Sequence, residues 1–451
     1  MCERTNDSTK LLQQMLDQRG DVRIPGGEYT ISDTLIIYDN TKLSLSFDTV
    51  IRLADGSNCV MLKNQACQTS GKNHNILVEG GKWDGNNKGQ EPDTKPEGKA
   101  YYFGVVMRFE EMEDLTVRDV TVKDPSRYAI QIKNTDRFTV DNITFDYNMY
   151  QKCMDGVHVQ GWARNGMIRN IKGATNDDLV ALNCDDYYDD GEKRSISQGD
   201  IENVVIDGVY ADNGYTAIRL LSCGSRMRNI KIRNVFGTYR LYGVSFTQHD
   251  IVPGAPVWFD NIDIDGVYCA KQPQDPPVDP KFIEGIDRHY RKGYHDKCIR
   301  IDTIIWFAKG VKCGNISIAN VHRDEETVTE AHTIQIDEGV HSEKLLLQNI
   351  TRRFHNCPEV PLIKNEGGVE KNLLQRANEL VQSGVQVITL LALSNEGTPF
   401  YDKALAAKLA GLGIPSFACT PDLFPGMMAA AIRKEDVNLW AAKQGIVVPK
   451  G

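Results

Sequence analysis

A short motif recurs along most of this chain and limits what the chain can fold into. Each copy begins with a polar residue, alternates apolar and variable positions, and then places Asn, Gly or Asp before another apolar residue. Clear copies begin at residues 75, 114, 137, 203, 229, 261, 315 and 344, and a degenerate copy begins at residue 165. The steps between successive copies run from 23 to 54 residues, and most are 39 or fewer.

The alternation predicts short strands with one buried face. The Asn, Gly or Asp that follows tolerates the left-handed backbone of a sharp bend. A sandwich or propeller of hairpins would instead favour two-residue Asn-Gly or Asp-Gly turns. One strand, bend and strand in each repeat therefore predicts an all-β protein, a right-handed parallel β-helix whose stacked coils share a core that no single coil can bury.

Both ends of the chain differ from the repeats. Residues 8–19 have the pattern of a short amphipathic helix, with Leu11, Leu12, Met15 and Leu16 on one face, and we expect this helix to cap the solenoid. After Gly367-Gly368, helical patterns alternate with apolar strands near residues 385–393 and 414–419. This alternation is typical of a parallel α/β layer. The sequence thus predicts a β-helix domain over residues 1–366 and a short α/β segment over residues 369–451.

Composition excludes some classes of protein. The net charge of −9 lacks the basic footprint of a nucleic-acid-binding protein, and no apolar run approaches the roughly 18 residues of a membrane span. The polar start of the chain lacks the pattern of a secretory signal, and the eleven cysteines form no CxxC pair. We expect free thiols and a cytoplasmic protein, or a secreted one if the native start was trimmed. The oligomeric state stays open.

The most suggestive polar residues lie one coil apart. Asp155 is followed 22 residues later by Asp177 and Asp178. Because equivalent residues of stacked strands lie about 4.8 Å apart, we expect these three carboxylates to converge on one face. Carboxylates that close repel, so one should hold its proton near neutral pH. A protonated acid beside an ionised base is what glycoside hydrolysis requires. The alternative is that these aspartates only cap turns.

On these residues the chain resembles the pectin-lyase-like superfamily and, within it, the polygalacturonase-type glycoside hydrolases of family 28. That family carries Asn-Thr-Asp-Gly, Gly-Asp-Asp, Gly-His-Gly and Arg-Ile-Lys on successive coils. Residues 154–156 match the first motif and residues 176–178 the second. The resemblance implies an inverting hydrolase of pectin-like polysaccharides or oligosaccharides, with Asp177 as the general acid and with Asp155 and Asp178 activating the water. It implies no cofactor and no metal.

The other two motifs of the family depart in this chain. Gly214-Tyr215-Thr216 stands where Gly-His-Gly is expected, and the counterpart of Arg-Ile-Lys is either residues 217–221, which keep Arg219, or residues 243–247, which keep neither basic residue. In the family these basic groups hold the galacturonate carboxylate, so a neutral or differently linked pectic sugar is a plausible substrate.

Five further residues are candidates for contacts with the carbohydrate. Each can also be an ordinary surface or core residue. The acidic stretch 184–190 can be a solvated loop, a surface for stacking a sugar or a source of Ca²⁺ ligands. The five candidates are His158, Tyr187, Tyr215, Arg219 and His249.

Two other functions remain open at this point. A polysaccharide lyase or epimerase on the same fold would need a basic residue near the sugar carboxylate, and a non-catalytic β-helix would only bind carbohydrate. The tail resembles the end of a von Willebrand factor A-type domain at residues 387–397 and 418–425, without the Asp-x-Ser-x-Ser loop with which that fold binds a metal.

Overall fold

The computed structural model describes residues 7–67, 69, 71–91, 104–151, 153–187, 195–248, 258–271, 303–325, 332–354, 363–365, 389–392 and 416–419. The chain divides into two compact units, Met1–Ile363 and Lys364–Gly451. Among the described helices, none is long and apolar enough to cross a membrane.

The larger unit is a right-handed parallel β-helix, as the repeats predict. Its elements are α1 (Thr9–Leu16), β1 (Gly20–Ile24), β2 (Gly27–Ile31), β3 (Leu35–Ile37), β4 (Thr41–Leu45), β5 (Thr49–Leu53), β6 (Leu62–Asn64), β7 (Asn73–Glu79), β8 (Lys82–Asp84), the 3₁₀ turn η1 (Asn87–Gly89), β9 (Met107–Arg118), β10 (Thr121–Lys123), β11 (Ile130–Asp146), β12 (Val157–Ala174), β13 (Asp178–Asn183), β14 (Asp185–Tyr187), β15 (Ser195–Gln198), β16 (Ile201–Gly214), β17 (Thr216–Leu221), β18 (Met227–Tyr239), β19 (Val244–Thr247), β20 (Phe259–Lys271), β21 (Ile305–Phe307), β22 (Lys312–Glu325), β23 (Ile334–Ile336), β24 (His341–Phe354) and β25 (Ile363–Asn365).

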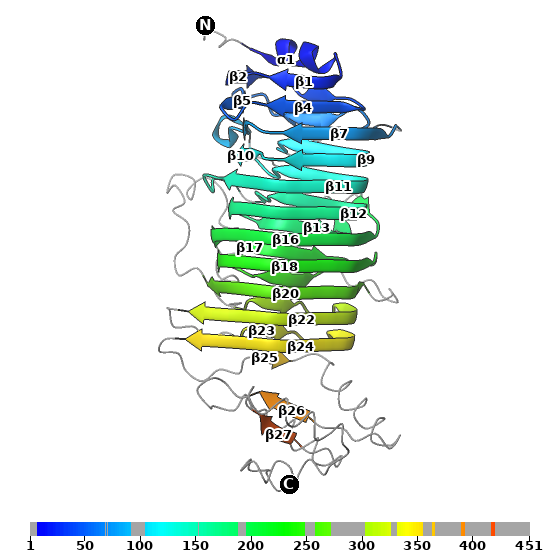
Figure 1. Cartoon of the computed structure of the whole chain (residues 1–451), viewed down its shortest axis with the longest axis vertical. Helices are drawn as coiled ribbons and strands as arrows, with labels where there is room; N and C mark the ends of the chain where they lie inside the picture. Colours follow the sequence, from blue (N-terminus) through cyan, green and yellow to red (C-terminus); the bar gives the residue numbers. More distant parts are fainter. Residues whose placement is uncertain are drawn as a thin grey trace. The chain divides into compact units, whose positions relative to one another are not determined.

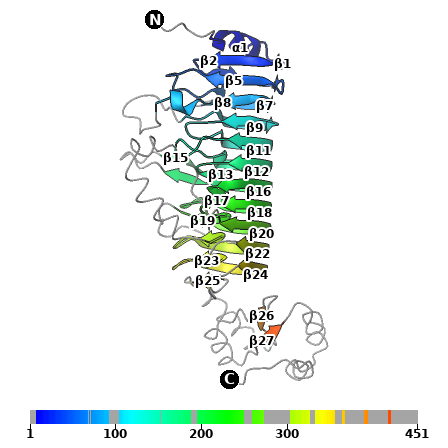
Figure 2. The same cartoon turned by 90° about the vertical axis from the view of Figure 1, so that its left-hand side faces the viewer.

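Each strand pairs in parallel with the equivalent strand of the next coil. The long strands β9, β11, β12, β16, β18, β20, β22 and β24 form one such series, and they stack in chain order in Figure 1. A second series, visible in Figure 2, runs from β12 through β13, β17, β19 and β21 to β23. The small antiparallel pair β14 and β15 lies outside this ladder.

Left-handed residues bend the coils where the motif predicts. Asn142, Asn170, Gly208, Asn234 and Gly266, which end successive motifs, have φ between 54° and 84°. The polar residue that opens most of the motifs is left-handed too, as at positions 137, 165, 203, 229 and 261, but not at positions 315 and 344. The sequence pattern did not indicate this second bend. Both bends lie inside continuous strands, so β11 is one strand of 17 residues where the motif suggested two short strands.

Side-chain amides link these bends from coil to coil. Asn229 donates a hydrogen bond to Asn203 (2.8 Å), and Asn261 donates one to Asn229 (2.7 Å). Because an asparagine amide both donates and accepts, a column of asparagines can bond along the whole stack.

The core is a set of apolar columns between the faces. One column holds equivalent, fully buried residues of six coils, which are Val140, Ile168, Ile206, Ile232, Ile264 and Ile318. At the N-terminal end, α1 buries Leu12 and Leu16 against the open end of this core. The predicted helix is confirmed, but Leu11 does not share the buried face and is 53% exposed.

Beyond the end of β25, the smaller unit is described only in two strands. β26 (Thr389–Ala392) and β27 (Ser416–Cys419) pair in parallel, in agreement with the parallel layer predicted for the tail. The helices predicted around them, and with them most of the resemblance to a von Willebrand factor A-type domain, lie outside the described residues.

The amide column gives a testable prediction for stability. Asn229→Ala removes two inter-coil hydrogen bonds and places a Cβ-bearing residue without a local hydrogen bond in the left-handed region. We expect the free energy of unfolding to fall by about 2–3 kcal/mol, measured by urea denaturation. Asn229→Gly is the matched control: it loses the same bonds but tolerates the backbone, so it should lose only about 1 kcal/mol. Equal losses for the two variants would contradict a left-handed requirement at this bend.

Candidate active site

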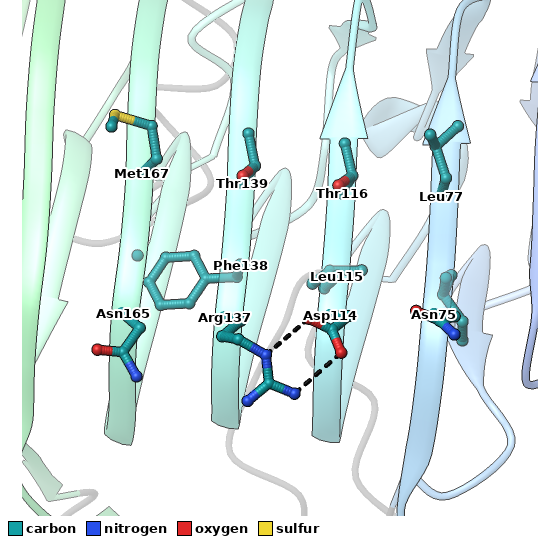
Figure 3. Close-up of a pocket in the computed structure, with 12 residues that line it drawn as sticks. Asn75, Leu77, Asp114, Leu115, Thr116, Arg137, Phe138, Thr139, Asn165 and Met167 are labelled. Carbon is teal, nitrogen blue, oxygen red and sulfur yellow. Dashed lines mark hydrogen bonds and ion pairs between the residues drawn. The ribbon is translucent and has the colours of Figure 1, made fainter.

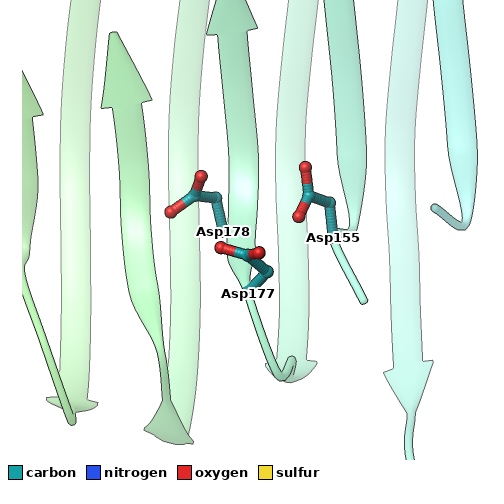
Figure 4. Close-up of side chains that lie close together, drawn as sticks. All are labelled: Asp155, Asp177 and Asp178. Carbon is teal, nitrogen blue, oxygen red and sulfur yellow. The ribbon is translucent and has the colours of Figure 1, made fainter. Parts of the chain in front are cut away.

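The three aspartates converge as predicted, at the start of two neighbouring strands. Asp155 lies just before β12, Asp177 lies in the turn before β13, and Asp178 is the first residue of β13. A carboxylate oxygen from each lies within 4.8 Å of the others, and Figure 4 shows the side chains gathered at one end of these strands. The register pairs Val157 with Val180, an offset of 23 residues. Asp155 is therefore the coil equivalent of Asp178, and Asp177 precedes that position.

Burial dominates the electrostatics of this acidic cluster, defined as Asp155, Asp177 and Asp178. Their exposed fractions are only 4%, 7% and 3%. Burial raises the pKa of Asp177 well above its ordinary value, and the charges of Asp155 and Asp178 raise it further. Burial also raises the pKa of Asp178 to about 7, although the positive charge of Arg219 and a hydrogen bond from Thr216 act in the opposite direction. Asp177 is thus the residue best suited to carry a proton at neutral pH.

His158 belongs to the same cluster of side chains. Its Nδ1 lies 2.5 Å from Oδ2 of Asp155, and Nδ2 of Asn183 lies 3.4 Å from its Nε2. The imidazole stacks on the ring of Tyr128, with centroids 3.9 Å apart and planes 8° from parallel. The histidine is only 2% exposed. The structure therefore places this candidate against a carboxylate and not on an accessible surface.

Arg219 also reaches the acidic cluster, from β17. Its Nη1 lies 3.7 Å from Oδ2 of Asp178, and its Nε donates a hydrogen bond to Oγ1 of Thr247 (3.1 Å). β17 pairs with β13, so that Asp178 lies opposite Thr216. The arginine thus balances part of the negative charge of the cluster.

The remaining candidates are placed differently. Tyr215 is buried beneath the guanidinium of Arg240, 5.5 Å from its ring centre, and Arg240 in turn bonds Oδ1 of Asn176 beside the acidic cluster. Tyr187 lies at the end of β14, and its side chain lies outside the described structure. His249 lies outside the described residues.

Three residues that contact the acidic cluster or His158 escaped the sequence reasoning. Thr216 bonds Asp178, Tyr128 stacks on His158, and Asn183 faces the far nitrogen of that ring. The step of 38 residues between the motif copies at 165 and 203, added to Asp178, would have found Thr216, which is its register partner. No sequence signal distinguishes Tyr128 from an ordinary apolar core residue.

The sequence led us to expect the aspartates on one face of the solenoid, and the structure shows in addition that they are almost wholly buried. The concavity drawn in Figure 3, of about 490 Å³, lies elsewhere, on the outer surface of β7, β9, β11 and β12 around Asp114 and Arg137. A sugar can reach the acidic cluster only if the cluster becomes more exposed than it is in this structure.

The spacing of the acidic cluster suits acid–base chemistry on a water molecule. A water that forms hydrogen bonds of about 2.7 Å can bridge two oxygens that are up to roughly 5.4 Å apart, so it fits between carboxylates at this separation. The same spacing also suits a divalent cation with oxygen ligands. The expectation of no metal therefore stays a prediction.

The fold and site define a parallel β-helix protein with a buried acidic cluster across two coils. Residues 40–188, about a third of the chain, match the family described as "Glycosyl hydrolases family 28". The resemblance predicted from the aspartate motifs is confirmed in this segment, which contains the whole acidic cluster and His158 but ends before Tyr215 and Arg219. No curated protein sequence matches the chain.

Several solved structures are similar to this chain at low identity. A family 28 exopolygalacturonase from Yersinia enterocolitica is 12% identical with a TM-score of 0.42, and covers 80% of this chain and 77% of its own. An endo-xylogalacturonan hydrolase from Aspergillus tubingensis is 11% identical with a TM-score of 0.47, and the match covers 81% of this chain and 97% of the hydrolase. PfbA, a surface adhesin of Streptococcus pneumoniae, is 14% identical with a TM-score of 0.45, and the match covers 80% of this chain and 89% of the adhesin.

The raised pKa of Asp178 predicts how stability depends on pH. An acid whose pKa is higher in the folded protein than its ordinary 3.8 binds its proton more tightly there, so stability is lost as pH rises from about 4 to about 7. Asp178→Asn cannot ionise, so we expect a higher thermal midpoint than the wild type at pH 8 and a similar midpoint at pH 4. Asp263→Asn, on the outer face of β20, is the control and should show no such difference. An equal effect of Asp178→Asn at both pH values would contradict the shift.

Proposed function

We propose that this protein is a glycoside hydrolase that cleaves glycosidic bonds in a pectin-like polysaccharide or oligosaccharide. The observation that carries the proposal is the acidic cluster, with its carboxylate oxygens within 4.8 Å of one another and with burial and like charges favouring a proton on Asp177. The family match over residues 40–188, which includes all three aspartates, supports the same class of reaction.

Each carboxyl group has a distinct role in the proposed mechanism. Asp177 donates its proton to the departing glycosidic oxygen, because its neutral form is favoured at the pH where a general acid must act. Asp155 and Asp178 orient a water and accept its proton as it attacks the anomeric carbon from the opposite face. The closed, weakly solvated surroundings strengthen these interactions relative to water.

The surroundings of the acidic cluster favour a neutral or weakly charged sugar at the cleavage point. Arg219, the residue that the sequence suggests for holding a uronate carboxylate, already contacts Asp178 and Thr247. Redirecting it to a substrate would leave Asp178 with less compensation for its buried charge. Tyr215, where the family motif has histidine, packs beneath Arg240.

A second candidate function is non-catalytic carbohydrate binding. The observation that favours it is the burial of the acidic cluster, because a cluster that no substrate reaches serves only the fold. A lyase or epimerase is the third alternative, with Arg219 as the nearby basic residue. The assays below separate the three.

The role of Asp177 gives a direct prediction for activity. Asp177→Asn keeps the shape of the side chain but cannot donate a carboxylic proton, so kcat on pectic oligosaccharides should fall by about 10²- to 10⁴-fold. Release of reducing ends measures this loss, and Asp263→Asn serves as the control that retains wild-type turnover.

The same assay discriminates the alternatives. Products that absorb in the ultraviolet as unsaturated uronides would indicate a lyase and contradict the hydrolase. Carbohydrate binding without turnover, unchanged in Asp177→Asn, would indicate a binding protein.

The stereochemical course is a separate prediction. The resemblance to family 28 implies that a water held by Asp155 and Asp178 attacks directly, with no covalent glycosyl-enzyme intermediate, so the first product should have the inverted anomeric configuration. The oxygens here lie within 4.8 Å of one another, closer than the roughly 6.5–9.5 Å usual for inverting enzymes, so the prediction rests on the resemblance and not on the spacing. Proton NMR, recorded before the anomers equilibrate, identifies the configuration of the first product. A retained configuration would show that one carboxylate is a nucleophile, and would contradict the assignment of both as bases.

A further inference from the structure

His158 is oriented by contacts on both ring nitrogens and on one face of the ring. Nδ1 faces Oδ2 of Asp155 at 2.5 Å, Nε2 faces the amide of Asn183 at 3.4 Å, and the ring lies flat against Tyr128. An imidazole so placed has little rotational freedom, and its position is fixed with respect to one carboxylate of the acidic cluster.

The chemistry of these contacts defines which nitrogen carries a proton. An ionised carboxylate only accepts hydrogen bonds, so the nitrogen beside Asp155 must be the donor. A neutral imidazole that is protonated at Nδ1 leaves a lone pair on Nε2, which the Nδ2 of Asn183 can satisfy as a donor. The arrangement therefore requires no positive charge on the buried ring.

We propose that His158 is a positioning residue that holds the carboxylate of Asp155 in a fixed orientation, so that Asp155 serves as the base toward water. The inference rests on the proposed function and adds a residue that neither the aspartate motifs nor the family's Gly-His-Gly position assigns. It differs from the sequence-based expectation that His158 contacts substrate, because both ring nitrogens and one face of the ring already face Asp155, Asn183 and Tyr128.

The charges around His158 explain why Asp155 needs such a donor. Asp177 and Asp178 approach from the β13 side, and each disfavours a further negative charge nearby. Three described cations lie around the cluster. Arg219 contacts Asp178, Arg240 bonds Asn176 beside Asp177, and Arg127 places its guanidinium over the Tyr128 ring at 5.1 Å. The side chain that faces Oδ2 of Asp155 is His158, and its Nδ1 supplies a directed hydrogen bond to the base beside a protonated Asp177.

Three substitutions test the proposal in the full chain. His158→Phe keeps the stacking on Tyr128 but removes the donor. His158→Asn places an amide N–H near the position of Nδ1, and His158→Gln places one near Nε2. For each variant we would measure kcat and KM on the oligosaccharide that the wild type cleaves best, together with the thermal midpoint as a control for folding.

We expect His158→Phe to lower kcat by about 10- to 100-fold with KM within about threefold of the wild type, because a misplaced base affects the chemical step and not binding. His158→Asn should recover kcat better than His158→Gln, because only the Asn amide lies near the position of Nδ1. If His158→Phe does not fold, the comparison of His158→Asn with His158→Gln tests the proposal instead.

Two outcomes overturn the inference, and they differ from failure of the proposed function. If the wild type cleaves its substrate and His158→Phe retains its kcat, His158 is not a positioning residue. If His158→Asn and His158→Gln are equally impaired in kcat, the position of the donor is irrelevant and the histidine is only structural. If the wild type itself releases no reducing ends from any pectic substrate, the hydrolase proposal is wrong, and so is this inference, which rests on it.

Discussion

The parallel register between neighbouring coils is the constraint on which the rest of the structure depends. Each coil satisfies its backbone hydrogen bonds through the coils above and below it, so no coil is stable by itself. A slip of one residue would exchange the inner and outer faces of a strand. The buried columns, such as the one through Ile206, and the left-handed bends both oppose that slip. Asp155 meets Asp178 because β12 and β13 keep this register.

Burial has two opposite effects at the acidic cluster. It raises the pKa of Asp177 and Asp178, which supplies a proton donor near neutral pH, and it makes every ionised carboxylate unfavourable for folding. The contacts from Arg219, Thr216 and His158 partly offset that penalty. Three buried carboxylates are unfavourable at positions that serve only packing, because apolar side chains of similar size would pack there without the desolvation penalty. This penalty favours a chemical role for the cluster over a structural one, despite its low exposure.

The sequence predicted the fold because one local pattern repeats and each copy agrees with the others. It also predicted that Asp155, Asp177 and Asp178 meet, because coil spacing converts sequence steps into neighbours. The exact pairing of Asp155 with Asp178 did not follow, since the offset is set by how the turn between β12 and β13 closes. The burial of the cluster and the stacking of Tyr128 did not follow either, because both depend on side chains far apart in the chain. Leu11 was misplaced for a simpler reason: a two-turn helix buries only a narrow stripe, and Leu12 and Leu16 fill it.

The departures from the family motifs are consistent with the proposed chemistry once the site is considered in three dimensions. The coil that should carry the histidine carries Tyr215 and Thr216, and of these Thr216 bonds Asp178. An imidazole is nevertheless present, supplied by His158 from the strand that follows Asp155. Neighbouring coils lie only about 4.8 Å apart, so side chains from different coils can reach the same carboxylates. A solenoid site is therefore defined by which groups surround the acids, and not by which coil contributes them. The absence of one motif from its expected coil is for this reason weak grounds for assigning a loss of catalysis.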